Sequence, residues 1–259
     1  MNQVAIFFFV VISLFAVILA LMELGRRVGV RRRKQDAEGA HEGLGAIDGA
    51  VFGLMGLLVA FTFSGAAARF DARRQLIGQE TNAIGTAYLR IDLLPAAAQP
   101  ALRDHFRNYV DARLGYFKNL GLDDAAARSE LEQSIALQRK IWSESIAGCE
   151  KAVSPATTTL VVTSLNEMID ITTTRSLALE MHPPAVVFWG LGLLVLASTL
   201  LAGYGMAEAG TRSWFHMLIY SVILASALYV ILDLEYPRVG LIRIDAADHV
   251  LVDLRKSMQ

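Results

Sequence analysis

The segment GAIDGAVFGLMGLLVAFTFSGAAA, residues 45–68, decides the fold of this chain. A transmembrane helix needs about 20 predominantly apolar residues, and no residue after Asp48 in this segment is charged. We therefore predict a transmembrane helix. Wound as an α-helix, the segment aligns small residues that recur at steps of three and four: Gly45, Gly49, Gly53, Gly56, Ala60 and Ser64. Such a stripe allows a second helix to approach closely, so we predict that these six residues form a helix-packing face.

The composition of the whole chain agrees with an integral membrane protein. Hydrophobic residues make up 54% of the 259 residues, which is high for a soluble protein. The formal net charge of -1 and the absence of a basic stripe with interleaved aromatics exclude nucleic acid as the expected partner. The single cysteine, Cys149, cannot form an intrachain disulfide, and we expect it to be an inert core thiol.

Three further segments have the length and apolarity of membrane spans, at residues 4–22, 185–207 and 214–232. The third span is rich in glycine (Gly190, Gly192, Gly203 and Gly205), which suits close helix packing. A basic cluster between residues 26 and 34 follows the first span and is predicted to be a short connecting loop. Membrane lipids are therefore expected partners, through contact of these side chains with anionic headgroups.

Residues 69–184 contain no apolar run long enough to span a membrane, and their periodicity is helical. Leu102, Phe106, Tyr109, Arg113 and Phe117 recur at three and four, and Leu131, Ile135, Trp142 and Cys149 recur at four and seven. Ser154 followed by Pro155 predicts a helix start, and this helix should end before residues 182–184.

We predict an all-α, polytopic membrane protein whose parts follow one another along the chain. The first two spans and their basic loop occupy residues 1–68, an inserted up-and-down helical bundle 69–184, a transmembrane hairpin 185–234, and a C-terminal amphipathic tail 235–259. In this tail we expect Asp245 to cap a short helix whose residues Val250, Leu251 and Leu254 share one face.

Four stretches resemble a family of bacterial membrane proteins known as bestrophin-like: GLLVAFTFSGAAARFDARR, ETNAIGTAYLRIDLLP, FRNYVDARLGYF and EYPRVGLIRIDAADHVLVDL. That family is remotely similar to the bestrophins, which are oligomeric anion channels with four membrane helices per subunit and a pore lined by the second. The resemblance implies a homo-oligomer in the bacterial inner membrane that passes chloride or other small anions. It places Phe52, Gly56, Val59 and Phe63 along the pore. Arg69, Arg73 and Arg74 follow just past the membrane end of this span, where we expect either contact with lipid headgroups or, around a pore, an anion-attracting mouth.

The sequence carries no motif for catalysis or for a cofactor. A nucleophile elbow, a phosphate-binding loop, paired cysteines and HExxH are all absent, and the five histidines are scattered. We therefore expect no enzyme, no catalytic residues, no cofactor and no metal ligands. No acidic cluster like the calcium clasp of bestrophins is present either.

Two functions remain open on the sequence. Charged residues near mid-depth of a span are absent, which argues against a proton-coupled or cation-coupled transporter but permits a passive path. The first function is therefore an oligomeric, anion-selective channel. The second is a non-conducting membrane protein whose helical bundle acts as a sensor or partner-binding module.

The density of the basic cluster at residues 26–34 gives a testable prediction of topology. Basic loops are retained in the cytoplasm, so the N-terminus, the bundle and the C-terminus should lie outside. A cysteine placed at Ser129 should then react with an impermeant thiol reagent in intact cells. Labelling that appears only after lysis would reverse this topology.

Overall fold

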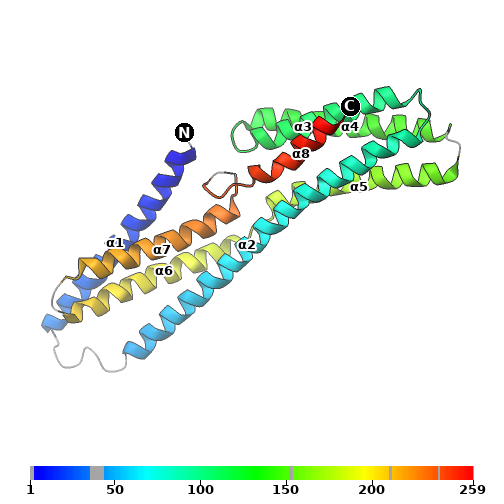
Figure 1. Ribbon diagram of the computed structural model, residues 1–259. Helices are drawn as coiled ribbons and strands as arrows, with labels where there is room; N and C mark the ends of the chain where they lie inside the picture. Colours follow the sequence, from blue (N-terminus) through cyan, green and yellow to red (C-terminus); the bar gives the residue numbers. More distant parts are fainter. Residues whose placement is uncertain (1–2, 36–43, 152–153, 210–211, 239, 259) are drawn as a thin grey trace. The chain divides into compact units, whose positions relative to one another are not determined.

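The computed structural model describes residues 3–35, 44–151, 154–209, 212–238 and 240–258, and over these ranges all regular structure is helical (Figure 1). The α-helices are α1 Gln3–Gln35, α2 Leu44–Arg90, α3 Gln99–Asn119, α4 Asp124–Cys149, α5 Pro155–Glu180, α6 Ala185–Gly205, α7 Trp214–Glu235 and α8 His249–Ser257. Short 3₁₀ helices lie at η1 Ile91–Leu93, η2 Met206–Ala209 and η3 Asp245–Asp248. Among the described residues, four helices are long and apolar enough to cross a membrane. The predicted all-α, polytopic fold class is confirmed.

The chain divides into two compact units. One contains residues 1–70 and 182–242, and we call it the transmembrane unit. The other contains residues 71–181 and 243–259, and we call it the bundle unit. Helix α2 contributes its first part to the transmembrane unit and its second part to the bundle unit.

In the transmembrane unit, α1 packs along α6 and α7 around a buried apolar cluster. The centre of the α1–α6 contact is a close approach of two backbones. A Cβ atom added at Gly203 of α6 would lie 2.0 Å from the carbonyl oxygen of Met22 in α1, and one added at Gly25 would lie 2.1 Å from that of Leu200. No larger side chain fits at either position, so these two glycines set the distance between α1 and α6.

Two helices run further than the sequence predicted. The basic cluster at residues 26–34 is helical, because α1 continues through Gln35 instead of ending at the membrane span. Helix α2 likewise continues beyond Ala68 to Arg90 without a break. Neither extension contains proline or a glycine in a left-handed conformation that would end the helix.

In the bundle unit, α3, α4 and α5 lie side by side and enclose an apolar core with the second part of α2 and with α8 (Figure 1). The helix starts follow the predicted capping chemistry. The Ser154 side chain accepts a hydrogen bond from the backbone N–H of Ala156 (3.2 Å) directly before Pro155, which confirms the start of α5. Asp123 caps α4 in the same way. Gly121, at φ +77°, makes the turn between α3 and α4.

The buried faces match the predicted spacing in α3 but only in part elsewhere. Leu102, Phe106 and Tyr109 are fully buried, and Cys149 is buried as expected. Ile135, however, is 39% exposed, because α4 turns the face of Ser134, Leu137, Gln138 and Ile141 to the core. In α8, Leu251 is buried whereas Val250 is 46% exposed, so these two do not share the buried face. The predicted cap, Asp245, has a side chain outside the described residues.

The close backbone approach predicts that Gly203→Ala disrupts the transmembrane unit. The added methyl group would collide with the Met22 carbonyl, and α1 and α6 would have to separate, at a cost of about 1–3 kcal/mol or more. The melting temperature of the detergent-purified protein should fall. The matched control is Gly192→Ala in the same helix, where no atom lies within 4 Å of the added Cβ. Equal melting temperatures for the two variants would contradict the assignment.

Candidate functional site

The face of α2 that carries the predicted small-residue stripe is open in the single chain. In the apolar 18-residue stretch that makes α2 a candidate membrane span, only 6% of the residues are buried. In the corresponding stretch of α7 the share is 44%. At four of the stripe positions no described atom outside the local helix backbone lies within 4 Å of an added Cβ: Gly45, Gly49, Gly53 and Gly56. Ala60 and Ser64 are exposed as well. Within the described residues, nothing from this chain packs on the stripe.

The opposite side of α2 packs on the transmembrane unit. Thr62 and Ala66 are buried there, and Met55 and Leu58 contact the apolar cluster of α1, α6 and α7. The Thr62 hydroxyl donates to the Leu58 carbonyl one turn earlier (2.7 Å), so its polar group is satisfied within the helix. Helix α2 is thus supported from one side only.

The predicted pore residues lie on or beside the open face. Phe63 is 45% exposed and Phe52 is half-buried. Gly56 is on the open stripe. Val59 lies at the edge, where it also contacts two apolar clusters of the transmembrane unit. The exposed apolar side chain of Phe61 (66%) projects nearly opposite Phe63, because two residues correspond to about 200° of helical rotation.

The three predicted mouth arginines have different surroundings. In the transmembrane unit, Arg69 donates to the carboxylate of Glu235 in α7, with Nη2 at 2.8 Å and Nε at 2.9 Å from Oε2. The Glu235 side chain is fully buried and also lies 2.8 Å from Nδ1 of His182, whose ring stacks on Tyr236. The charge of Arg69 is therefore matched within the unit.

Arg73 is buried in the bundle unit and Arg74 is exposed. Arg73 donates from Nε to the Ala178 carbonyl and from Nη2 to the Met181 carbonyl, both at 3.0 Å. These are carbonyls at the C-terminal end of α5 that no helical N–H can reach, so Arg73 caps this helix. The Arg74 side chain is 57% exposed and lies 3.7 Å from Asp71. Of the three, Arg74 keeps the most contact with solvent.

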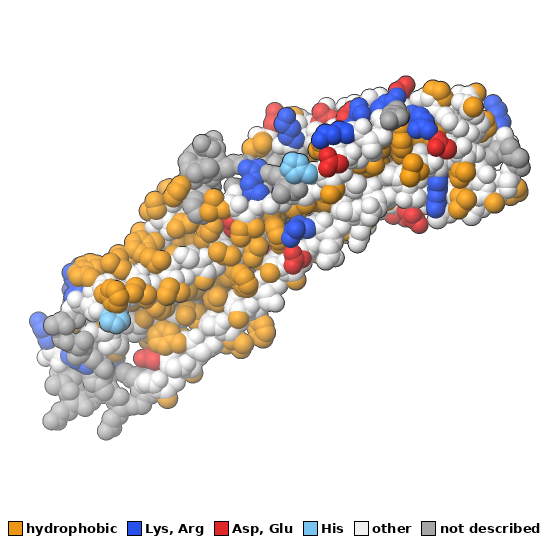
Figure 2. All heavy atoms as spheres, in the orientation of Figure 1, with side chains coloured by type: hydrophobic (Ala, Val, Ile, Leu, Met, Phe, Trp, Pro, Cys, Tyr) orange, Lys and Arg blue, Asp and Glu red, His pale blue; other side chains and the backbone are white. Residues whose placement is uncertain are grey.

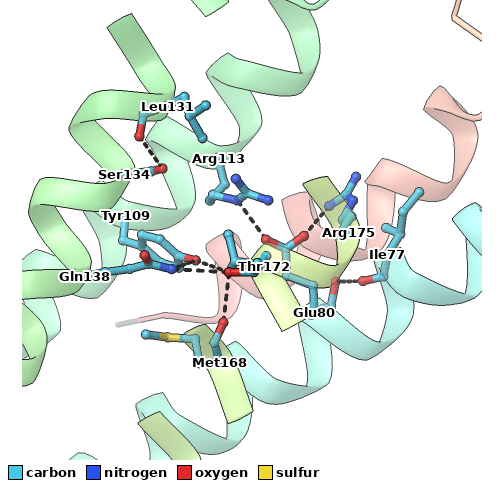
Figure 3. Close-up of polar contacts among 12 residues, drawn as sticks. Ile77, Glu80, Tyr109, Arg113, Leu131, Ser134, Gln138, Met168, Thr172 and Arg175 are labelled. Atoms are coloured by element: carbon cyan, nitrogen blue, oxygen red, sulfur yellow. Dashed lines mark hydrogen bonds and ion pairs between the residues drawn. The ribbon is translucent and has the colours of Figure 1, made fainter. Parts of the chain in front are cut away.

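A buried ionic cluster that sequence analysis did not single out lies in the bundle unit (Figure 3). Glu80 of α2 accepts hydrogen bonds from Nε of Arg113 in α3 (2.7 Å) and from Nη1 of Arg175 in α5 (2.5 Å). Arg175 also donates to Asp248 of η3 (2.8 Å). Both arginine side chains lie against the ring of Phe117. Two buried cations thus face two carboxylates, which joins four segments of the bundle unit.

A neutral hydrogen-bond network lies next to this cluster (Figure 3). The Tyr109 hydroxyl lies 2.9 Å from the Thr172 hydroxyl, and the Gln138 amide donates to both. Burial raises the pKa of Tyr109 and lowers the pKa of Arg175, in each case because desolvation disfavours the charged form. Tyr109 is therefore a neutral hydrogen-bonding group that fixes the packing of α3, α4 and α5.

These clusters have the character of structural contacts. Over the described ranges, no group of three or more His, Cys, Asp or Glu side chains is placed to hold a metal ion. Every carboxylate of the Glu80 cluster is engaged by arginine. Among the described residues, the small-residue stripe of α2 is an open face on which no other part of the chain packs.

The comparison with known proteins assigns the family. The family model described as "Bestrophin-like domain" matches residues 4–248. The chain belongs to the bestrophin-like family. Crystal structures of two variants of a bacterial bestrophin homologue from Klebsiella pneumoniae share the fold of this bestrophin-like chain. One gives a TM-score of 0.69 at 18% identity, over 95% of this chain and 98% of that chain. The other gives 0.68 at 16% identity, over 94% and 98%. No curated protein matches the sequence at a significant level.

The Glu80 cluster of this bestrophin-like protein left a signal in the sequence. Arg113 occurs at the same three-and-four spacing as the apolar residues of α3, where a solvent-facing residue is not expected. Glu80 likewise falls three residues after Ile77 and four before Ile84, which are both buried. A charged residue in register with a buried face predicts a buried ion pair, although the spacing does not identify the partner.

Removing the central carboxylate should destabilise the bundle unit. In Glu80→Gln the guanidinium groups of Arg113 and Arg175, which are buried, lose their shared counter-charge. Breaking a buried ion pair in this way lowers the free energy of unfolding by about 3–5 kcal/mol. The melting temperature of the purified protein, followed by circular dichroism, should fall clearly. Asp104→Asn is the control, because Asp104 is 64% exposed and pairs with Arg107 on the surface. A melting temperature for Glu80→Gln equal to that of Asp104→Asn would show that the cluster contributes little.

Proposed function

We propose that this chain assembles into an oligomeric, anion-selective ion channel of the bacterial inner membrane, with α2 lining the pore. The family supports the class of function, since the known bestrophins are anion channels. The observation that carries the proposal is the open face of α2, with nothing within 4 Å of the Cβ positions at Gly45, Gly49, Gly53 and Gly56.

The open face suits a symmetric assembly better than contact with lipid. In a bilayer, helices associate through close packing, and small residues are concentrated where that packing occurs. No described part of the chain packs on the stripe of α2, so it is available to the same helix of neighbouring subunits or to a water-filled path between them. We assign homo-oligomerisation to this face.

Within such a pore, Phe52, Val59 and Phe63 would form apolar constrictions around the small-residue position Gly56. Narrow apolar rings in a channel gate by dewetting, and each ring repeats one side chain from every subunit. Phe63 is the best placed of the three, because nearly half of its side chain is exposed in the single chain.

The positive mouth in this proposal rests on Arg74. Arg69 and Arg73 are held by Glu235 and by the carbonyls at the end of α5, so their donors are directed into the protein. Arg74 comes after Phe63 in the sequence of α2, and its side chain is more than half exposed. Repeated around a symmetry axis, its charge would concentrate anions and repel cations.

Reconstitution in liposomes tests the channel function. The purified oligomer should pass chloride, and Phe63→Ala should increase the conductance several-fold, because a wider ring is wetted more readily. Phe61→Ala is the matched control, since it is the same change on the nearly opposite face of α2 and should leave the conductance unchanged. Arg74→Glu should lower the chloride-to-sodium permeability ratio in a reversal-potential measurement, whereas Arg139→Glu on the exposed surface of α4 should not.

Three results would contradict the proposal in different ways. A wild-type oligomer that passes no current, with a Phe63→Ala variant that is also silent, would favour the non-conducting, partner-binding protein. A current that responds equally to Phe61→Ala and Phe63→Ala would show conduction by a path that α2 does not line. A monomer by light scattering would remove the symmetry on which both the constriction and the mouth depend.

A further inference from the structure

The end of the transmembrane unit where α1 and α6 finish carries basic side chains that the pore proposal does not use (Figure 2). They come from the last part of α1 and from the segment just before α7: Arg26, Arg27, Arg31, Arg32, Arg33, Lys34 and Arg212. Because the basic segment of α1 is helical, these groups have defined positions, which a flexible loop would not give them.

Packing against α6 and η2 fixes the orientation of this part of α1. A Cβ added at Gly29 would lie 2.8 Å from the Tyr204 carbonyl and 2.7 Å from the Ala207 side chain, so the helices touch closely there. Nη1 of Arg33 donates to the Ala207 carbonyl (3.1 Å) on the same side. The opposite side of the helix therefore faces outward, and it carries Arg27 and Arg31, one turn apart.

Three guanidinium groups share one carboxylate at this end. Glu23 accepts from Nε of Arg26 (3.0 Å), Nε of Arg27 (2.8 Å) and Nη2 of Arg212 (2.6 Å). One carboxylate balances only one of these charges. The side chains of Arg27 and Arg212 are 64% and 38% exposed, so they retain N–H donors that are accessible from outside.

Apolar side chains lie directly beside these donors. Leu24 and Val28 are 51% and 48% exposed on the outward face of α1. The guanidinium of Arg212 stacks over the ring of Trp214 (4.9 Å), which is 49% exposed, and Phe215 is 69% exposed. Tryptophan at a helix end beside arginine is the arrangement found at the boundary between acyl chains and headgroups.

From this geometry we propose that Arg27, Arg31 and Arg212, with Trp214, form a binding site for the phosphate of an anionic phospholipid. The exposed guanidinium donors bind the phosphodiester oxygens, for which their planar geometry is suited. The acyl chains of the same lipid lie along Leu24 and Val28. The site requires only the transmembrane unit in a bilayer, so it is independent of conduction and of which leaflet this end occupies.

Quenching of Trp214 by brominated lipid tests the site. The full chain carrying Trp142→Phe and Trp189→Phe retains Trp214 as its single tryptophan. In phosphatidylcholine nanodiscs, brominated phosphatidylglycerol should quench Trp214 at a much lower mole fraction than brominated phosphatidylcholine. A basic side chain near a membrane surface favours an anionic lipid by a factor of about five. Arg27→Gln with Arg31→Gln should therefore reduce the preference at least about fivefold.

Matched variants separate a lipid site from a general charge effect. Arg128→Gln with Arg139→Gln removes the same charge from exposed positions of α4 and should leave the preference unchanged. Arg27→Lys with Arg31→Lys should retain most of it. Equal quenching by the two brominated lipids, or a preference that survives the double Gln change, would overturn the proposal. The preference should also survive millimolar glycerol phosphate, because the acyl chains hold the lipid as well; its loss would overturn the placement of those chains along Leu24 and Val28.

Discussion

Close contact between the backbones of α1 and α6 is the interaction on which the transmembrane unit depends. Lipid tails are as apolar as leucine, so burying a side chain against another helix gains little from the hydrophobic effect, and dispersion contacts become decisive. Gly203 opposite the Met22 carbonyl and Gly25 opposite the Leu200 carbonyl permit those contacts. The Thr199 hydroxyl donates to the Val195 carbonyl of its own helix (2.7 Å), so its polar group is satisfied within α6.

The same physics explains why the open face of α2 is significant. A small-residue stripe weakens a helix, because glycine has the least favourable backbone entropy and contributes no side-chain contacts of its own. At Gly25 and Gly203 that disadvantage is offset by close packing, whereas at Gly53 and Gly56, as at Gly192 of α6, no described atom is near enough to offset it. Another subunit supplies this packing to α2 in the assembly we propose.

The sequence predicted structural features that neighbouring residues determine, but it did not predict contacts between residues that are distant along the chain. Ser154 and Pro155 specify a helix start by themselves, and the structure places the start of α5 there. Glycine-rich spans were recognised, but residue type does not say which glycines meet another backbone: Gly203 does, and Gly192 in the same helix does not. The Glu80 cluster was missed for the same reason, because Arg113 and Arg175 are distant in sequence and only the fold brings them together.

The arginines near the membrane show why charge alone does not identify an ion-binding residue. From the sequence, Arg69 and Arg73 were predicted to belong to a positively charged pore mouth. In the structure Arg69 neutralises a buried carboxylate, and Arg73 caps the C-terminal end of a helix. An arginine can attract a mobile anion or a lipid phosphate only if its charge is not already balanced and its donors reach solvent. Arg74 meets the condition of exposure on α2, and Arg27 meets both conditions on α1, where three guanidiniums share Glu23. An arginine of this chain is therefore a candidate for anion binding when it keeps solvent-exposed N–H donors beyond those that a carboxylate or carbonyl already accepts.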